Sequence, residues 1–238
     1  MKEKRVTVVL SVALAVLIIS FAIGLPIYFR PFYYMQIGPL GLEESSGLSH
    51  GEIREAYNEL LDYLTLPFAD YGMGKLHGGA KSIGHFADVK VLFMINASLF
   101  LASLLTVTVI LVLVKKKKVT LEHFRQLGFE YWTGKYMLIG ALALGLIVLL
   151  NFEAAFEAFH SFMFPGKTDW RFEGGTDQII RILPAEFFMS CAALIFAVII
   201  LSALALVIIG VVRKKRRLAR LHALYEEENK TRAGTDNI

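Results

Sequence analysis

Four long stretches that are almost free of charged residues constrain this chain more than any other feature. Two of them, Val6–Phe29 and Val91–Val114, each contain 24 residues and no charge. At about 1.5 Å per residue in an α-helix, each is longer than the roughly 30 Å hydrocarbon core of a bilayer. The shorter run Tyr136–Leu150 needs residues from its flanks to cross, and Ala185–Val212 carries only Glu186. With 55% apolar residues overall, the sequence predicts an integral membrane protein.

The predicted fold is therefore an all-α membrane protein with four transmembrane helices, spanning about 6–29, 91–114, 135–152 and 184–212. Residues 1–217 would form a single transmembrane domain, with outer segments 30–90 and 153–183. The first apolar run follows a basic lead-in, as in a signal peptide, but it is too long and no cleavage site follows it, so we expect an uncleaved anchor. Residues 218–238 form a polar tail for which we expect cytoplasmic location and disorder.

Basic residues predict the orientation of these helices. They cluster near the N-terminus, at Lys115–Lys118 and at Arg213–Arg217, all on one side of the predicted membrane. The positive-inside rule assigns this side to the cytoplasm, together with both termini. The first outer segment holds five basic and eight acidic residues, a net charge of −3. We therefore expect the functional site of this cell-membrane protein at its extracytoplasmic face.

An amphipathic helix is predicted in the first outer segment. In "SHGEIREAYNELLDYL" the apolar side chains of Ile53, Tyr57 and Leu61 share one helical face. The preceding "GLSHG" matches the spelling of a serine hydrolase elbow, but no strand precedes it. Ser49, followed three residues later by Glu52, instead predicts a capping box at the start of this helix.

Two groups of ionisable residues flank the apolar runs on the outer side. His85 and Asp88 are three residues apart in "GHFADVK", so that on a helix the carboxylate can accept a hydrogen bond from the imidazole. Glu153, Glu157 and His160 line one helical face in "NFEAAFEAFHSFMF". Ionisable groups at this depth are costly unless they are paired or functional. The alternative for the first group is anchoring, with His85 and Lys90 reaching the lipid headgroups, and the alternative for the second is a paired polar seam between helices.

Further residues complete the expected outer site. Trp170 is typical of a membrane-interface anchor, and we expect Arg30, Lys90 and Trp170 to contact a lipid substrate. Cys191 is the single cysteine, so the outer segments must be ordered without an internal disulfide.

Three motifs in order along the chain carry a resemblance to a known family. "HFADVK" before the second run, "FHSFMF" after the third and "ILPAEFF" at the start of the fourth are similar to the bacterial lipoprotein intramolecular transacylase family, Lit. The resemblance implies a membrane acyltransferase that moves the sn-2 acyl chain of a diacylglyceryl-cysteine lipoprotein to its own α-amino group. It also implies that His85 and His160 are the catalytic residues.

The chemistry of the residues agrees with this resemblance. Ester aminolysis needs a base for the amine and an acid for the departing oxygen, which two histidines supply without metal, nucleotide or other cofactor. Asp88 would orient His85, and Glu153 or Glu157 would bind the ammonium or tune His160. An acyl-histidine intermediate is an open alternative, as is which histidine acts as base. We expect a monomer whose partners are a diacylated lipoprotein and membrane lipids, with no nucleic acid.

Two other functions remain open from the sequence. A membrane metallohydrolase would use His85, Asp88, Glu157 and His160 as ligands, although no compact metal motif is present, and chelator sensitivity would identify it. A noncatalytic scaffold is disfavoured because the polar residues gather at the outer ends of the helices rather than at mid-membrane.

The charge pattern makes a testable prediction of topology. A cysteine placed at Trp170 should react with a membrane-impermeant thiol reagent added outside intact cells, and one placed at Lys117 should react only after permeabilisation. The reverse labelling pattern would contradict the predicted orientation.

Overall fold

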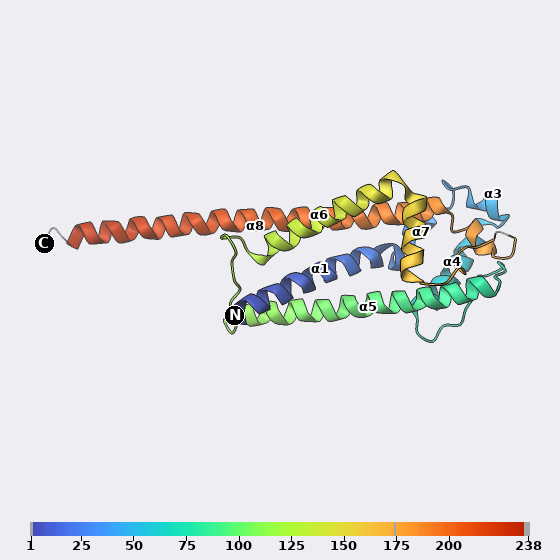
Figure 1. Cartoon of the computed structure of the whole chain (residues 1–238), viewed down its shortest axis with the longest axis horizontal. Helices are drawn as coiled ribbons and strands as arrows, with labels where there is room; N and C mark the ends of the chain where they lie inside the picture. The colour runs from blue at the N-terminus through green and yellow to red at the C-terminus, as the bar shows by residue number, and fades with distance from the viewer. Residues whose placement is uncertain (1, 174, 236–238) are drawn as a thin grey trace. The chain divides into compact units, whose positions relative to one another are not determined.

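The computed structural model describes residues 2–173 and 175–235, and within these ranges it is built from helices. Figure 1 shows their course. In chain order they are α1 (Lys2–Tyr28), α2 (Pro31–Tyr34), α3 (Leu42–Ser46), α4 (His50–Thr65), α5 (Ala80–Lys115), α6 (Phe129–Leu150), α7 (Phe152–Met163), the 3-10 helix η1 (Gln178–Arg181) and α8 (Ala185–Thr235). The prediction of an all-α protein is confirmed for the described residues.

Four of these helices, α1, α5, α6 and α8, are long and apolar enough to cross a membrane. Their most apolar windows have mean hydropathies of 2.9, 2.6, 1.9 and 3.2, and at most 22% of any window is buried inside the protein. Large apolar side chains such as Leu105, Leu149 and Leu201 are consequently exposed. In water such a surface would be unfavourable, whereas in lipid it is the expected exterior of a membrane protein.

The helix ends differ from the predicted spans for local reasons. The third helix starts at Phe129 and stops at Leu150, because the side chain of Asn151 accepts a hydrogen bond from the Ala154 amide (3.0 Å) and begins a new helix, α7. The last helix does not stop at its basic cluster but continues to Thr235. The expectation of disorder is therefore wrong for residues 218–235, whose residues "LARLHALYEEE" are good helix formers.

Close packing divides the chain into two compact units. Of the described residues, unit 1 comprises 2–15, 103–140 and 200–235, and unit 2 comprises 16–102, 141–173 and 175–199. Both groups of ionisable residues predicted from the sequence belong to unit 2.

Helix α4 forms much of the core of unit 2. Its predicted capping box is confirmed, since Ser49 and Glu52 exchange both hydrogen bonds. The predicted apolar face is buried as well. There Tyr57 stacks on Tyr33 with ring centroids 3.7 Å apart, and the Tyr33 hydroxyl donates to the carbonyl of Ile182 (2.8 Å). This aromatic core joins α2 and α4 to the segment that leads into α8.

In unit 1, helices α6 and α8 approach each other through two glycines. A Cβ atom on Gly134 would lie 2.6 Å from the carbonyl oxygen of Ala203, and one on Gly210 would lie 2.6 Å from the Cβ atom of Tyr131. Such distances are far below van der Waals contact, so only glycine permits this approach. Small residues serve helix packing in membranes in this way.

We therefore predict that Gly134→Ala and Gly210→Ala each destabilise the protein by about 1–3 kcal/mol, as overpacking does in a well-packed core. Thermal unfolding in detergent would measure the effect. Gly140→Ala, in the same helix α6, is the matched control because nothing lies within 4 Å of its added Cβ. Equal melting temperatures for the three variants would contradict this account of the packing.

Candidate functional site

The two histidines predicted from the sequence meet in unit 2. His85 lies in the first turns of α5 and His160 in the last turn of α7, and their ring centroids are 5.7 Å apart. The side chains are buried, with residue exposures of only 6% and 7%. Residues 75 positions apart in the chain thus form one polar pair in apolar surroundings.

Aromatic rings surround this pair. Phe164 and Phe172 lie 4.9 and 5.4 Å from the ring of His85, both edge-on. Phe156 and Trp170 lie 4.1 and 4.7 Å from the ring of His160. Burial among these rings disfavours the charged imidazolium and lowers the pKa of His160 below its ordinary value. His160 is therefore neutral at physiological pH and able to accept a proton.

The backbone fixes which nitrogen of His160 is free to react. Its Nδ1 lies 2.8 Å from the carbonyl oxygen of Phe156, one turn earlier in α7. Because a carbonyl can only accept, Nδ1 carries the proton and donates it, which leaves Nε2 as the basic nitrogen. For His85 the situation is different, since its buried Nδ1 has no hydrogen-bond partner among the described residues.

The acidic residues expected to support the histidines have other contacts. Asp88 forms an ion pair with Lys167 rather than with His85 Nδ1. Glu157 pairs with Arg171 (3.6 Å), and both of these side chains are largely exposed. Glu153 is exposed in the first turn of α7. The negative charge of Asp88 still acts on the His85 ring. For His160, the main influence on the pKa is burial, and no carboxylate of the described residues contributes to it.

Of the three residues expected to contact substrate, only Trp170 packs against the histidine pair. Arg30 forms an ion pair with Asp62 of α4 and donates to Asn58 (3.1 Å). Lys90 places its ammonium 4.2 Å from the ring centroid of Tyr63. The contacts of Arg30 and Lys90 thus hold α4 and its surroundings in place.

Asp169 is a residue that the sequence reasoning missed. It follows Lys167 closely in the loop after α7, and its Oδ1 atom is buried with no hydrogen-bond partner among the described residues. Its Oδ2 atom would lie 3.3 Å from a Cβ placed on Gly84, the neighbour of His85. The only signal in the sequence was its position beside Trp170 in "KTDWR".

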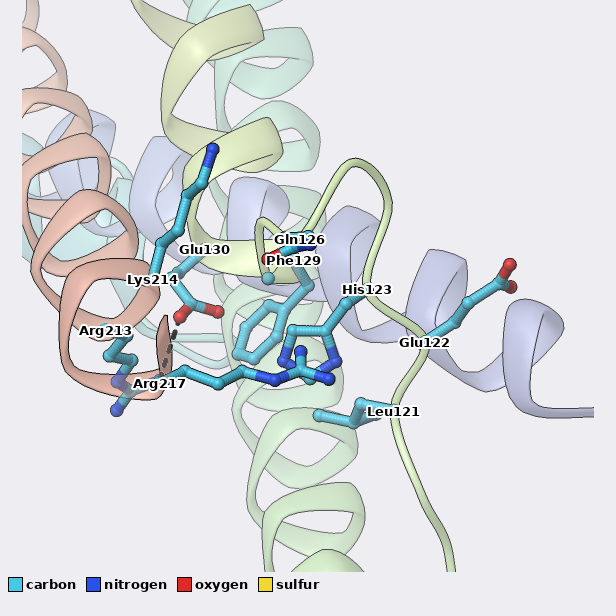
Figure 2. A pocket seen from close by; sticks show the side chains of 10 residues that line it. Leu121, Glu122, His123, Gln126, Phe129, Glu130, Arg213, Lys214 and Arg217 are labelled. Atoms are coloured by element: carbon cyan, nitrogen blue, oxygen red, sulfur yellow. Dashed lines mark hydrogen bonds and ion pairs between the residues drawn. The ribbon is translucent and has the colours of Figure 1, made fainter. Parts of the chain in front are cut away.

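Two hollows elsewhere do not include the histidines. Figure 2 shows a cavity of about 130 Å³ in unit 1, where Arg213 forms an ion pair with the buried Glu130 (3.2 Å). Its lining residues are Leu121, Glu122, His123, Gln126, Gly128, Phe129, Glu130, Arg213, Lys214 and Arg217. An open groove in unit 2 follows α4 and is lined by Gly51, Arg54, Glu55, Asn58, Glu59 and Asp62.

The ligand set considered for a metallohydrolase is not assembled. Within residues 2–173 and 175–235, no three His, Cys, Asp or Glu side chains gather closely enough to hold a metal ion. Two of the four supposed ligands, Asp88 and Glu157, form ion pairs with Lys167 and Arg171.

Comparison with known proteins identifies relatives over most of the chain. Residues 8–188 match the family model described as lipoprotein intramolecular transacylase Lit. The solved structure of the membrane integral lipoprotein intramolecular transacylase Lit from Bacillus cereus is similar, with a TM-score of 0.79 and 28% sequence identity, over 90% of this chain and 96% of that one. A structure of the same bacterial protein with an H85R mutation matches with a TM-score of 0.72 and 27% identity, over 90% of this chain and 93% of that one.

A more distant relative is an uncharacterised protein of Aquifex aeolicus, 26% identical over 128 residues. That match covers 51% of this chain and 53% of the relative, so this chain spans about half the length of the Aquifex aeolicus protein. The family match, by contrast, extends from the first long helix through the histidine pair to the start of α8. The chain therefore belongs to the Lit family of lipoprotein intramolecular transacylases, which are integral membrane enzymes.

Proposed function

We propose that this protein transfers the sn-2 acyl chain of a diacylglyceryl-cysteine lipoprotein to the α-amino group of the same cysteine, leaving a lyso-form lipoprotein. The observation that carries this proposal is the pair of buried histidines, 5.7 Å apart, in a chain of the Lit family. Aminolysis of an ester requires proton transfers, and two adjacent neutral imidazoles provide nitrogen atoms that can accept and donate these protons.

His85 and His160 are the catalytic residues in this proposal. His85 accepts the first proton of the substrate ammonium, and the amine attacks the ester carbonyl. His160 Nε2, with its tautomer held by Phe156, takes the second proton from nitrogen and passes it to the departing glycerol oxygen. The products are an amide and a glycerol hydroxyl, and the proton on His85 returns to solvent. The His85 imidazolium also stabilises the oxyanion on the carbonyl carbon while the tetrahedral intermediate exists.

The tethering of ester and amine within one molecule supplies a large part of the rate. Positioned intramolecular reactions gain many orders of magnitude in effective concentration, so the site needs only to orient the two groups and exclude water. The aromatic rings around the histidines support this role. Trp170, which packs on His160, is the residue that we propose to contact the acylated glycerol. Arg30 and Lys90 would have to leave Asp62 and the ring of Tyr63 to contact the substrate.

The proposed site belongs to the extracytoplasmic face of the cell membrane. The support is the distribution of basic clusters, from which the positive-inside rule predicts that residues 30–90 and 153–183 lie outside. A lipoprotein anchored in the outer leaflet would reach the histidines without leaving the bilayer. We propose that the protein acts as a monomer, with the membrane lipids and the lipoprotein as its partners.

The source of the transferred chain tests the proposed reaction. We predict that purified protein, given a diacylated lipopeptide with a labelled sn-2 chain in excess unlabelled phospholipid, moves the label to the cysteine nitrogen. Mass spectrometry of the lipopeptide would locate it. If the label stays on glycerol while an unlabelled chain appears on nitrogen, phospholipid is the donor and the intramolecular reaction is refuted.

Each histidine of the pair should be indispensable to that reaction. His85→Ala and His160→Ala are predicted to lower the rate of N-acylation by at least about 100-fold, the usual contribution of one acid–base group. The controls are alanine variants of the four remaining histidines, all of which are exposed: His50, His77, His123 and His222. An active His160→Ala variant, or equal losses for His77→Ala and His85→Ala, would count against the assignment.

A further inference from the structure

Two consecutive residues of the loop after α7 each approach one histidine. Trp170 packs on the ring of His160, at 4.7 Å between centroids. Asp169 lies against Gly84 at the His85 side, and its carboxylate acts electrostatically on His85. The loop thus delivers an apolar side chain to one imidazole and a negative charge to the other.

The carboxylate of Asp169 is incompletely satisfied. Its buried Oδ1 has no hydrogen-bond partner in the described part of the chain. The two cationic residues nearest to Asp169 in sequence contact other groups. Lys167 forms an ion pair with Asp88. Arg171 pairs with Glu157, and its guanidinium lies 4.7 Å from the ring centroid of Trp170. A buried carboxylate oxygen without a donor is unfavourable, so Asp169 Oδ1 is a candidate acceptor for a cation or an N–H donor of a ligand.

The proposed substrate carries one such cation at its reacting end. The α-amino group of the N-terminal cysteine is mainly protonated near neutral pH and has three N–H donors. We infer that Asp169 Oδ1 binds this α-ammonium group and presents it to His85. This inference rests on the proposed function and identifies the subsite for the acceptor nitrogen.

The proton balance of the reaction fits this subsite. The ammonium gives one proton to His85 and becomes the nucleophilic amine, and Asp169 takes no part in the proton transfer. The carboxylate then faces the His85 imidazolium and offsets the cost of forming that charge among aromatic rings. The glutamates predicted to bind the ammonium fit less well, since Glu153 and Glu157 are exposed to solvent.

Gly84 makes room for this carboxylate. An alanine here would place its Cβ 3.3 Å from Asp169 Oδ2, closer than most such contacts. Gly84→Ala should therefore displace the carboxylate without removing its charge, which provides a second variant for the experiment.

The test measures binding of two non-transferable lipopeptides, in which ether-linked chains replace the esters of the diacylglyceryl-cysteine. One has a free α-amine and the other an N-acetyl group, which carries no charge. Wild-type protein in detergent micelles should bind the free amine about tenfold more tightly, the size of one charge-assisted hydrogen bond. In Asp169→Asn this preference should fall to near one, with unchanged affinity for the N-acetyl compound.

Matched variants make the result decisive. Asp70→Asn removes the same charge from an exposed outer position and should keep the tenfold preference. If Asp169→Asn keeps it too, or if Glu157→Gln abolishes it instead, the assignment of the ammonium to Asp169 is overturned. If Asp169→Asn loses affinity for the N-acetyl compound as well, Gly84→Ala decides: a reduced preference supports the subsite and a full preference refutes it.

The result of this binding test can be distinguished from the result of a test of the proposed reaction. Ether analogues bind without reacting, so an Asp169-dependent preference in a protein that forms no N-acyl product would refute the reaction and keep the ammonium subsite. Product formation together with a preference that ignores Asp169 would refute the subsite alone.

Discussion

The buried carboxylate of Asp177 joins the two chain segments on which the candidate site depends. Its Oδ1 accepts from the amide of Gly79 (3.1 Å), just before α5 begins, and its Oδ2 accepts from the Thr176 hydroxyl (3.3 Å). The adjoining residues reinforce this link, since the Gln178 amide donates to the His77 carbonyl (3.1 Å). His85 lies six residues beyond Gly79, and the loop with Asp169 and Trp170 ends at Asp177. Hydrogen bonds of Asp177 and Gln178 to residues 77 and 79 thus connect the start of α5, which carries His85, to the end of this loop.

Burial, rather than ion pairing, sets the chemistry of the histidine pair. The ion pairs near the site, Asp88 with Lys167 and Glu157 with Arg171, involve partly or largely exposed side chains and contribute little to stability. The rings of Phe156, Phe164 and Phe172 instead exclude water, keep His160 neutral and strengthen every electrostatic contact within the site. A site of this kind suits an ester and an amine that must react with each other before water reaches them.

The sequence predicted those features that obey a regular pattern. A helix that crosses a bilayer must be long and nearly uncharged, so the four apolar runs could be identified without knowledge of any tertiary contact. The capping box of Ser49 and the buried face with Tyr57 follow helical periodicity, as does the face that carries His160. The predicted topology has His85 and His160 on the same side of the membrane, and in the structure their ring centroids are 5.7 Å apart. Asp169 was missed because it lies in an irregular loop, where spacing carries no information about which side chain turns inward.

Ion-pair partners were also beyond prediction from spacing. Asp88 was expected to orient His85, three residues away, but it forms an ion pair with Lys167, which is distant in the sequence. Arg30 likewise pairs with Asp62 of α4. Such pairs depend on how loops fold back, which local periodicity does not encode. The helical extension of α8 to Thr235 was missed for the opposite reason, because polar composition was taken to mean disorder although the residues favour a helix.

The aromatic core around Tyr33 and Tyr57 has a consequence for where such a protein can assemble. Small domains outside the cytoplasm commonly rely on disulfides, which need an oxidant and an isomerase to form correctly. Here Cys191 has no second cysteine to pair with, and the stacked rings of Tyr33 and Tyr57, with the Tyr33 hydroxyl bound to Ile182, organise the segment with α2 and α4 instead. The folding of this segment therefore needs no disulfide within the chain, and neither an oxidant nor an isomerase to form one.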